Sequence, residues 1–441
     1  MLITIDTVRA DRLSSYGYRL PTTPNLDWFA ARGVRFERAL SPSSSTAPTH
    51  ASIFTGQLPS DHSIGAFNSQ FALDDEWPTL AERLRSHGYK TAAVVSNPLL
   101  GRALGLDRGF DHYDDETVGV GRFAAKGRRA QVAVDRALTW LDQQQREPFF
   151  LWLHLQDAHG PYAPDPAWIC PLEPHPEPPT GELPIGRDPS GYRAIPTYQV
   201  WDAVRAVAGY SRRYDCELAG LDAQLGRLLG RVVDDPRLQG ALVAVTADHG
   251  EAFGEDEFFF AHGHGVGLDQ VRVPLILAGP GLPRGGVIEA PVGLTGLFGS
   301  LLAFAGIAPT QGESAGLPGL AGVPGGPESS TPVYVESLNQ VGVAVGGGFA
   351  RRDLRPSSDA AFWEGGNPNS GGGYWEPLGE VEWTGFGTEA SSAEGRAEAQ
   401  EQLAAFAERV SQTRTARRGH RRALELTAEQ AAALEGLGYA Q

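Results

Sequence analysis

The stretch ALVAVTADHGE, residues Ala241–Glu251, decides the fold of this chain. It begins with a continuous apolar run, Ala241–Thr246, as expected of a strand in a sheet that is covered on both faces. Two polar residues, Asp248 and His249, follow where that strand ends. Four other short runs have the same apolar character and are predicted strands: Leu2–Ile5, Thr91–Val95, Phe149–His154 and Pro274–Leu277.

Amphipathic stretches lie between the apolar runs. Val134, Leu138 and Leu141 fall on one face of residues 128–142. A longer stripe with helical spacing consists of Leu218, Leu221, Leu225, Leu228 and Val232. Strands that alternate with helices form a mainly parallel sheet, because each crossover places a helix on one face of it. We therefore predict an α/β fold in which a large, mostly parallel, mixed β-sheet is flanked by helices on both faces.

The amino-acid composition of the chain changes after Gly279. Gly and Pro dominate residues 309–327 and 365–373, which indicates loops or linkers. A short predicted strand, Val333–Val335, lies between them, and a helical stretch follows over Ala393–Leu434. We predict a main α/β domain over residues 1–315. A Gly/Pro-rich linker and a small C-terminal α+β subdomain are predicted over residues 316–441.

Composition narrows the classes of partner. The chain has 441 residues and a formal net charge of −16, which argues against nucleic acid because phosphate backbones require clustered Lys and Arg. Its two cysteines, Cys170 and Cys216, predict no disulfide framework and no metal cluster. No apolar run reaches the length of about 20 residues that a membrane-spanning helix needs. The sequence gives no sign of oligomeric state.

The cellular location stays open at this stage. No signal peptide is visible, but the chain opens directly with the predicted strand Leu2–Ile5, so its natural beginning is expected to lie elsewhere. A periplasmic or extracellular location is expected if the natural N-terminus carries a signal peptide, and a cytoplasmic one otherwise.

Residues with acid–base and metal-binding chemistry follow the predicted strands. Asp6 ends the first strand, His159 follows the third, and Asp248 with His249 follows the fourth. Ligands of open parallel sheets bind beyond the carboxyl ends of the strands, so these residues are expected to meet. Carboxylate and imidazole together suit zinc or manganese better than calcium, which prefers oxygen. Taken alone, Asp6 is better explained as a helix N-cap than as a metal ligand.

Two further motifs supply hydroxyl and imidazole groups. In TAPTHASIFTG, residues Thr46–Gly56, the hydroxyl of Thr46 stands before a predicted helix, whose N-terminal dipole favours an anion or an alkoxide. Taken alone, this motif is better explained as a capping turn rich in Ser and Thr. In HLQDAHGPY, residues His154–Tyr162, the imidazoles suit proton transfer or metal binding near neutral pH. For each histidine alone, a structural role is equally well supported.

The order of these motifs along the chain resembles the sulfatase family of the alkaline-phosphatase superfamily. Four other matching motifs are TTPNL (Thr22–Leu26), GFDHY (Gly109–Tyr113), RVPL (Arg272–Leu275) and LGY (Leu437–Tyr439). The resemblance runs nearly end to end. It implies a sulfatase-like α/β fold and a hydrolase that acts on sulfuric or phosphoric ester bonds.

The chain departs from the sulfatase pattern at the nucleophile. Sulfatases oxidise a Cys or Ser to formylglycine, but Thr46 occupies that position, so no formylglycine is expected. His50 replaces the Arg that supports the modified residue. Ser96 and Pro98 stand where the family holds sulfate through Lys and His. The remaining set is similar to that of phospholipid-dependent phosphotransferases, which use an unmodified Thr and one metal ion.

The resemblance assigns three overlapping groups of residues. It implies that one divalent metal ion (Zn, Mn or Ca) is held by Asp6, Thr46, Asp248 and His249. The implied catalytic residues are Thr46, His50, His159 and His264. The implied substrate-binding residues are Asn97, His159, His262 and His264. A second metal ion is a weaker alternative, for which Asp157 and His159 are the spare pair.

These residues predict a metal-dependent hydrolase of anionic esters with Thr46 as nucleophile, acting on a small-molecule, glycan or lipid ester. Cleavage of phosphate diesters is slightly favoured over cleavage of sulfate esters, because a sulfated threonine lacks the route by which formylglycine hydrate expels sulfate. The alternatives are a phosphoryl-headgroup transferase and a non-catalytic protein that binds anions or glycans. Selectivity is expected to come from variable loops at Tyr198–Arg213 and Gly342–Gly387.

Overall fold

A computed structural model gives the fold of the chain. It describes residues 1–64, 71–117, 127–144, 147–165, 168–172, 181–201, 204–320, 331–345, 347–356, 375–386, 393–417, 422–423, 427–428 and 431. Two predicted features fall outside these residues: the terminal LGY motif and the last part of the predicted C-terminal helix, which includes Leu424 and Leu434.

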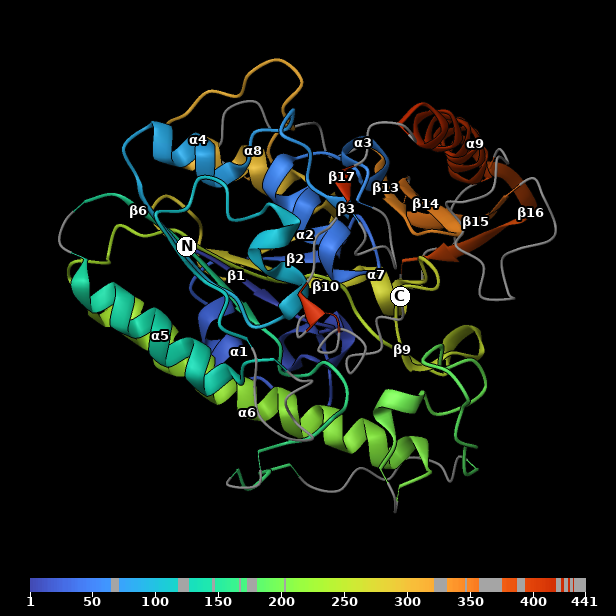
Figure 1. Cartoon of the computed structure of the whole chain (residues 1–441), viewed down its shortest axis with the longest axis horizontal. Helices are drawn as coiled ribbons and strands as arrows, with labels where there is room; N and C mark the ends of the chain where they lie inside the picture. The colour runs from blue at the N-terminus through green and yellow to red at the C-terminus, as the bar shows by residue number, and fades with distance from the viewer. Residues whose placement is uncertain are drawn as a thin grey trace.

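A large sheet forms the centre of the molecule (Figure 1). In the described part of the chain it has nine strands, in the order β11-β2-β10-β7-β1-β6-β4-β5, with β12 also beside β2. Strands β7, β1, β6, β4 and β5 are parallel, whereas β10 runs antiparallel to both β7 and β2. The prediction of a mostly parallel, mixed sheet is therefore confirmed. The bounds are β1 Leu2–Ile5, β2 Val34–Leu40, β4 Lys90–Val94, β5 His112–Asp114, β6 Phe149–Leu155, β7 Val243–Ala247, β10 Arg272–Ala278, β11 Gly286–Ile288 and β12 Val292–Gly293.

Helices cover both faces of this sheet (Figure 1). On one face, α1 (Pro24–Ala30) and α5 (Ala130–Gln143) pack against the long helix α6 (Val207–Asp234). On the other, α2 (Thr46–Thr55) and α4 (Leu80–Ser86) pack against α8 (Gly296–Phe304). The whole predicted leucine stripe of α6 is buried, which removes its apolar surface from water. None of the helices among the described residues is long and apolar enough to cross a membrane.

A second, smaller sheet lies beside the first. Strands β13 (Val333–Glu336), β14 (Gln340–Val345), β15 (Gly348–Pro356) and β16 (Trp375–Gly385) form an antiparallel meander, and α9 (Ala393–Ala416) packs on it. Their shared core includes Val341, Val343, Leu403, Phe406 and Val410. The elements of the large sheet and its helices end at Phe304, so the division near residue 315 remains our proposal for the domain boundary.

Three sequence-based predictions need correction here. The described part of the region Gly342–Gly387 is not a variable loop, because most of its residues lie in β14, β15 and β16. Tyr198–Arg213 is a loop only in its first half, since α6 begins at Val207. The C-terminal helix ends at Ala416 instead of continuing to residue 434, and the short strand β17 (Arg422–Ala423) then pairs with β3 (Phe71–Ala72).

The prediction that Cys170 and Cys216 provide no disulfide framework also needs correction. Cys170 and Cys216 form a disulfide between the segment after β6 and helix α6. They are 46 residues apart in sequence, and only the docking of α6 beside that segment brings them together. The remaining short elements are α3 Pro59–His62, α7 Leu268–Val271, β8 Ala252–Phe253, β9 Phe259–Ala261 and the 3-10 helices Ala10–Arg12, Ser14–Tyr16, Pro98–Leu100, Arg102–Leu104, Thr197–Gln199 and Glu255–Glu257.

Candidate active site

Two neighbouring parallel strands bring the first candidate residues together. Asp6 directly follows β1, and Asp248 with His249 directly follows β7. Because β1 and β7 are parallel and adjacent, these residues emerge at the same edge of the sheet. The backbone N–H of Thr7 donates to Asp248 Oδ1 at 3.2 Å, which ties the two strand ends to each other.

A compact cluster forms around the ring of His249. Its Nε2 lies 3.7 Å from Asp6 Oδ1, 3.7 Å from Asp248 Oδ2 and 3.2 Å from the Thr46 hydroxyl. All four side chains are buried. His249 Nδ1 is 2.9 Å from the carbonyl oxygen of Gly250, so it carries the proton and donates it there. The lone pair of Nε2 is therefore directed at the two carboxylates and the hydroxyl.

The electrostatics of this cluster favour a cation. Burial, with the nearby charge of Asp248, raises the pKa of Asp6 to about 6, and burial raises the pKa of Asp248 to about 7. Burial lowers the pKa of His249, so its ring stays neutral. Asp6 Oδ1 and Asp248 Oδ2 have no hydrogen-bond partner in the described structure, and buried polar atoms are seldom left in that condition. Two carboxylate oxygens, an imidazole nitrogen and a hydroxyl form a donor set that fits zinc or manganese.

Thr46 is the first residue of α2 and its side chain is fully buried. His50, one turn later, has Nδ1 at 2.8 Å from the Thr46 carbonyl oxygen and Nε2 at 2.9 Å from the Thr4 hydroxyl. Burial lowers the pKa of His50 to about 3, so the ring is neutral, donates through Nδ1 and accepts through Nε2. The two hydrogen bonds of the His50 ring thus link the first turn of α2 to β1. They place His50 against the backbone of Thr46.

Asn97 is placed against a carboxylate. Its Nδ2 donates to Asp6 Oδ2 at 2.8 Å, and its Oδ1 accepts from the backbone N–H of Leu99 at 2.9 Å. These two bonds fix the amide and, through it, the direction of the Asp6 carboxylate. Asn97 is therefore positioned to orient a candidate metal ligand.

Two of the predicted histidines lie beside the cluster. The ring of His262 is centred 4.3 Å from that of His249, and the ring of His159 is centred 5.1 Å from that of His262. His159 Nδ1 is 2.7 Å from the carbonyl oxygen of Gly160, and His159 is close enough to Asp6 to lower the pKa of that carboxyl. The structure thus brings His159 and His262 to the same place as Asp6 and His249.

A buried carboxylate that the sequence argument did not use orients His262. Glu251 Oε1 lies 2.9 Å from His262 Nδ1, and its Oε2 accepts from the Tyr162 hydroxyl at 2.8 Å. Burial raises the pKa of Glu251 well above its usual range. Glu251 and Tyr162 each lie at the end of a motif that carries candidate site residues. Glu251 directly follows Asp-His-Gly, and Tyr162 directly follows His-Gly-Pro. Their position in these motifs is the sequence signal that could have identified them.

His264 lies near His262: burial lowers the pKa of that imidazole, and the charge of His264 lowers it further. Its ring stacks on Phe258 with a centroid distance of 4.4 Å, and it interacts with Asp188 and the backbone of Ser190. Burial lowers its pKa to about 4, against the opposite effect of Asp188.

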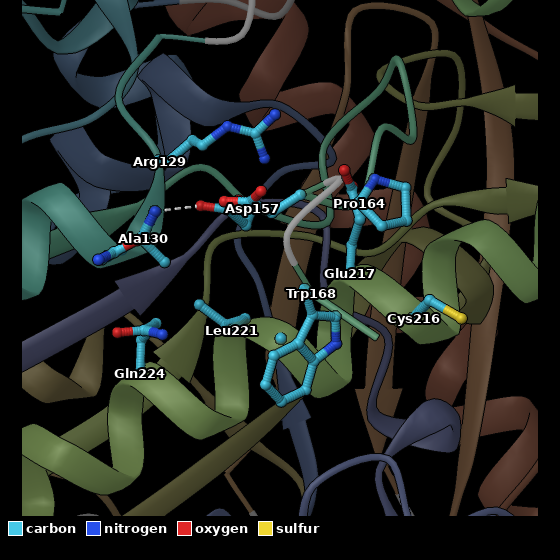
Figure 2. Close-up of a pocket in the computed structure, with 12 residues that line it drawn as sticks. Arg129, Ala130, Asp157, Pro164, Trp168, Cys216, Glu217, Leu221 and Gln224 are labelled. Carbon is cyan, nitrogen blue, oxygen red and sulfur yellow. Dashed lines mark hydrogen bonds between the residues drawn. The ribbon is translucent and has the colours of Figure 1, made fainter. Parts of the chain in front are cut away.

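Asp157, half of the alternative second-metal pair, is directed away from the cluster. Its carboxylate accepts from the backbone N–H of Ala130 at the start of α5, as the dashed line in Figure 2 shows. Asp157 lines a cavity of about 150 Å³ together with Trp168 and Glu217. The described residues that line this cavity do not include Thr46 or the candidate metal ligands, so it is separate from the cluster.

Comparisons with known proteins agree with this architecture. A model of the sulfatase family matches residues 1–307. A sulfatase of Formosa agariphila is 25% identical over 329 residues, and a choline-sulfatase of Rhizobium meliloti is 26% identical over 313. The first match covers 65% of this chain and 64% of the relative, and the second covers 59% of each. The chain thus spans less than two thirds of the length of these curated relatives.

Solved structures show the same fold. A protein in complex with its substrate D-glucosamine-2-N,6-O-disulfate superimposes with a TM-score of 0.67 at 17% identity, covering 94% of this chain and 98% of that one. A phosphonate monoester hydrolase from Silicibacter pomeroyi gives a TM-score of 0.64 at 18% identity, covering 94% and 95%. The family model extends over most of the chain, from β1 to α8, and on that ground this protein belongs to the sulfatase family.

Proposed function

We propose that this chain is a metal-dependent hydrolase of anionic esters in which Thr46 is the nucleophile, and that it cleaves phosphate diesters in preference to sulfate esters. The observation that carries the proposal is the position of the Thr46 hydroxyl, 3.2 Å from His249 Nε2 at the N-terminus of α2. A hydroxyl there is adjacent to a donor set for a cation and to the positive end of a helix dipole.

The reaction would proceed in two displacements. The Thr46 hydroxyl gives up its proton and its oxygen attacks phosphorus, the bond to one ester oxygen breaks and that oxygen leaves as an alcohol after it gains a proton, and a phosphothreonine that still carries the second ester group remains. Water then attacks this phosphorus, which breaks the bond to Thr46 and releases the phosphate monoester. His262, oriented by Glu251, and His159 are the imidazoles placed to accept the proton of Thr46, pass it to the leaving oxygen and, while protonated, hold the anionic group.

A divalent cation would be held by Asp6, Asp248, His249 and Thr46. It would lower the pKa of the hydroxyl and offset negative charge on the transferred group. His50 would keep Thr46 at the start of α2, and Asn97 would keep Asp6 directed at the cation. Because the Thr46 side chain has no exposed surface, an ester reaches it only after neighbouring side chains move aside.

The preference for diesters follows from charge and from the unmodified hydroxyl. Diesters and sulfate esters are both monoanionic, which suits a site with few cationic side chains. The chain has two lysines, of which Lys90 is exposed at the start of β4 and Lys126 lies outside the described residues. A sulfated Thr46 would lack the hydrate that expels sulfate from formylglycine, whereas a phosphothreonine can be opened by in-line attack of water. The leaving alcohol belongs to a small molecule, a glycan or a lipid.

The test compares matched nitrophenyl esters on purified protein supplied with zinc or manganese. We expect kcat/KM to be higher for the diester than for the sulfate and to fall at least 1000-fold in Thr46→Ala, while Ser44→Ala, which removes a neighbouring buried hydroxyl, stays within about 3-fold. Chelation with EDTA should abolish turnover. Faster sulfate turnover would overturn the substrate preference, and full activity of Thr46→Ala would overturn the nucleophile.

The same assay addresses the two alternatives. Adding glycerol as a second acceptor distinguishes hydrolysis from transfer, because a transferase would release phosphoglycerol esters at the expense of phosphate monoester. A protein that binds anions without catalysis would show binding of a diester by calorimetry and no metal-dependent turnover.

A further inference from the structure

His154 is a buried imidazole without the hydrogen bonds that burial normally requires. It lies on β6, where it pairs in register with Thr4 of β1, and its side chain has no exposed surface. Neither Nδ1 nor Nε2 has a hydrogen-bond partner among the described residues. Buried polar groups nearly always have a hydrogen-bond partner, and binding of a metal ion is one of the few explanations for an exception. The side chain therefore indicates a ligand at this place.

The carboxylate of Asp6 faces two imidazoles, one with each oxygen. Oδ1 is 3.7 Å from His249 Nε2, and Oδ2 is 3.7 Å from His154 Nε2. Both distances are too long for a hydrogen bond. They are close to the spacing of roughly 3.4 Å between two ligand atoms that each lie about 2.1 Å from a tetrahedral zinc ion. The Nε2 atom of His154 thus lies as far from the Asp6 carboxylate as the Nε2 atom of His249 does. His249 is one of the candidate ligands of the first cation.

Asp248 belongs to two groups of potential ligands. One consists of Asp6, Asp248 and His249, and the other of His50, His154 and Asp248, with the donor atoms of each group within 4.8 Å of one another. His50 already uses both ring nitrogens, toward the Thr46 carbonyl and the Thr4 hydroxyl. His154 is therefore the imidazole of the second group whose nitrogens are available.

We propose that His154, Asp248 and Oδ2 of Asp6 hold a second divalent cation beside the first, with the carboxylates of both Asp6 and Asp248 shared between the two sites. The donors are imidazole nitrogen and carboxylate oxygen, which select zinc or manganese. Asn97, which donates to Asp6 Oδ2, keeps that oxygen directed at the second cation. Two dications against two carboxylates leave a positive centre that suits an anionic ester, and paired cations can stabilise both the attacking and the leaving oxygen.

This proposal rests on the proposed function for its first cation, but it does not require Thr46 to be the nucleophile. It also differs from the sequence-based alternative, because Asp157 is directed at α5 and takes no part.

The experiment counts cations in the full chain. The protein is stripped of metal, loaded with zinc, dialysed against a weak chelator and measured by plasma mass spectrometry. We expect two equivalents in the wild type and one in His154→Gln. The matched control is His62→Gln, because His62 is also buried but has Nε2 2.9 Å from Ser52 Oγ and Nδ1 accepting from the Ile64 N–H. That variant should keep two equivalents.

A second readout uses only the wild type and so does not depend on the folding of any variant. Loading with Mn²⁺ should give the electron paramagnetic resonance spectrum of two coupled ions. One equivalent and an uncoupled spectrum in the wild type would overturn the second site while leaving the first intact. Two equivalents in His154→Gln would overturn the role of His154. No retained metal in the wild type would overturn the proposed function as well.

Discussion

The substitution Glu251→Gln tests whether a buried carboxylate directs the chemistry through His262. Burial raises the pKa of Glu251, but in the working enzyme we expect its carboxyl to be ionised, so that it accepts at 2.9 Å from His262 and at 2.8 Å from Tyr162. A glutamine of the same shape has one oxygen, so it can accept only one of these bonds and turns an NH₂ toward the other donor. A hydrogen bond to a charged group contributes about 1.5–3 kcal/mol. If it orients His262 in the transition state, kcat should fall by about 10- to 150-fold with little change in KM.

The assay is steady-state hydrolysis of a nitrophenyl diester at saturating metal, with thermal unfolding as a check on folding. His262→Ala should lose at least as much, and the double variant little more than His262→Ala alone, because the carboxylate acts through the imidazole. Glu217→Gln, a buried glutamate outside the cluster, is the matched control and should keep its kcat. Full activity in Glu251→Gln would mean that Glu251 carries a proton in the working enzyme, which would refute the reasoning.

Three further predictions concern stability, measured by chemical unfolding. Replacing Cys170 and Cys216 by Ser should lower the free energy of unfolding by up to about 4 kcal/mol, from the loss of a cross-link over 46 residues, and an unchanged value would contradict this. Phe406→Ala should lower the free energy of unfolding by about 3–5 kcal/mol, because the ring is buried between α9 and the small sheet. A decrease of less than about 1 kcal/mol would mean that α9 does not pack there. Burial raises the pKa of Asp222 to about 6, so the folded chain binds the carboxyl proton of Asp222 more tightly than the unfolded chain does. The free energy of unfolding should therefore fall by up to about 3 kcal/mol as the pH rises from about 4 through 6. Asp222→Asn should flatten this part of the pH profile, and an identical slope would rule Asp222 out.

The central strands could be predicted because a strand that is buried on both faces of the sheet has a continuous run of apolar residues. Leu2–Ile5 and Phe149–Leu155 are continuous apolar runs, and the structure makes them neighbours. Strand β2, Val34–Leu40, was missed because it mixes buried positions with half-exposed Arg35 and Glu37. In the small sheet, glycines on either side of β15 suggested loops, although the valines of β14 alternate as a strand requires.

The candidate metal ligands could be predicted because each directly follows a strand of a parallel sheet. Asp6, Asp248 and His249 have that position in the sequence, and topology alone brings them together. The orientation of side chains could not be predicted in this way. Whether His50 faces a substrate or the Thr46 carbonyl depends on hydrogen bonds made across the fold. The missing partners of His154 likewise become visible only once its neighbours are in place.

The position of β1 in the middle of the sheet has a consequence for how this protein is made. Its residue Leu2 pairs with Trp152 on one side and with Ala244 on the other. A ribosome that makes roughly 5–20 residues per second delivers those partners many seconds after β1. Until then β1 has neither neighbour in the sheet, and closing such long loops slows folding. Because Asp6 and Asp248 meet only when β7 joins β1, the candidate metal site is expected to be among the last parts of the nascent chain to assemble. A chaperone that shields β1 should therefore raise the yield of folded protein.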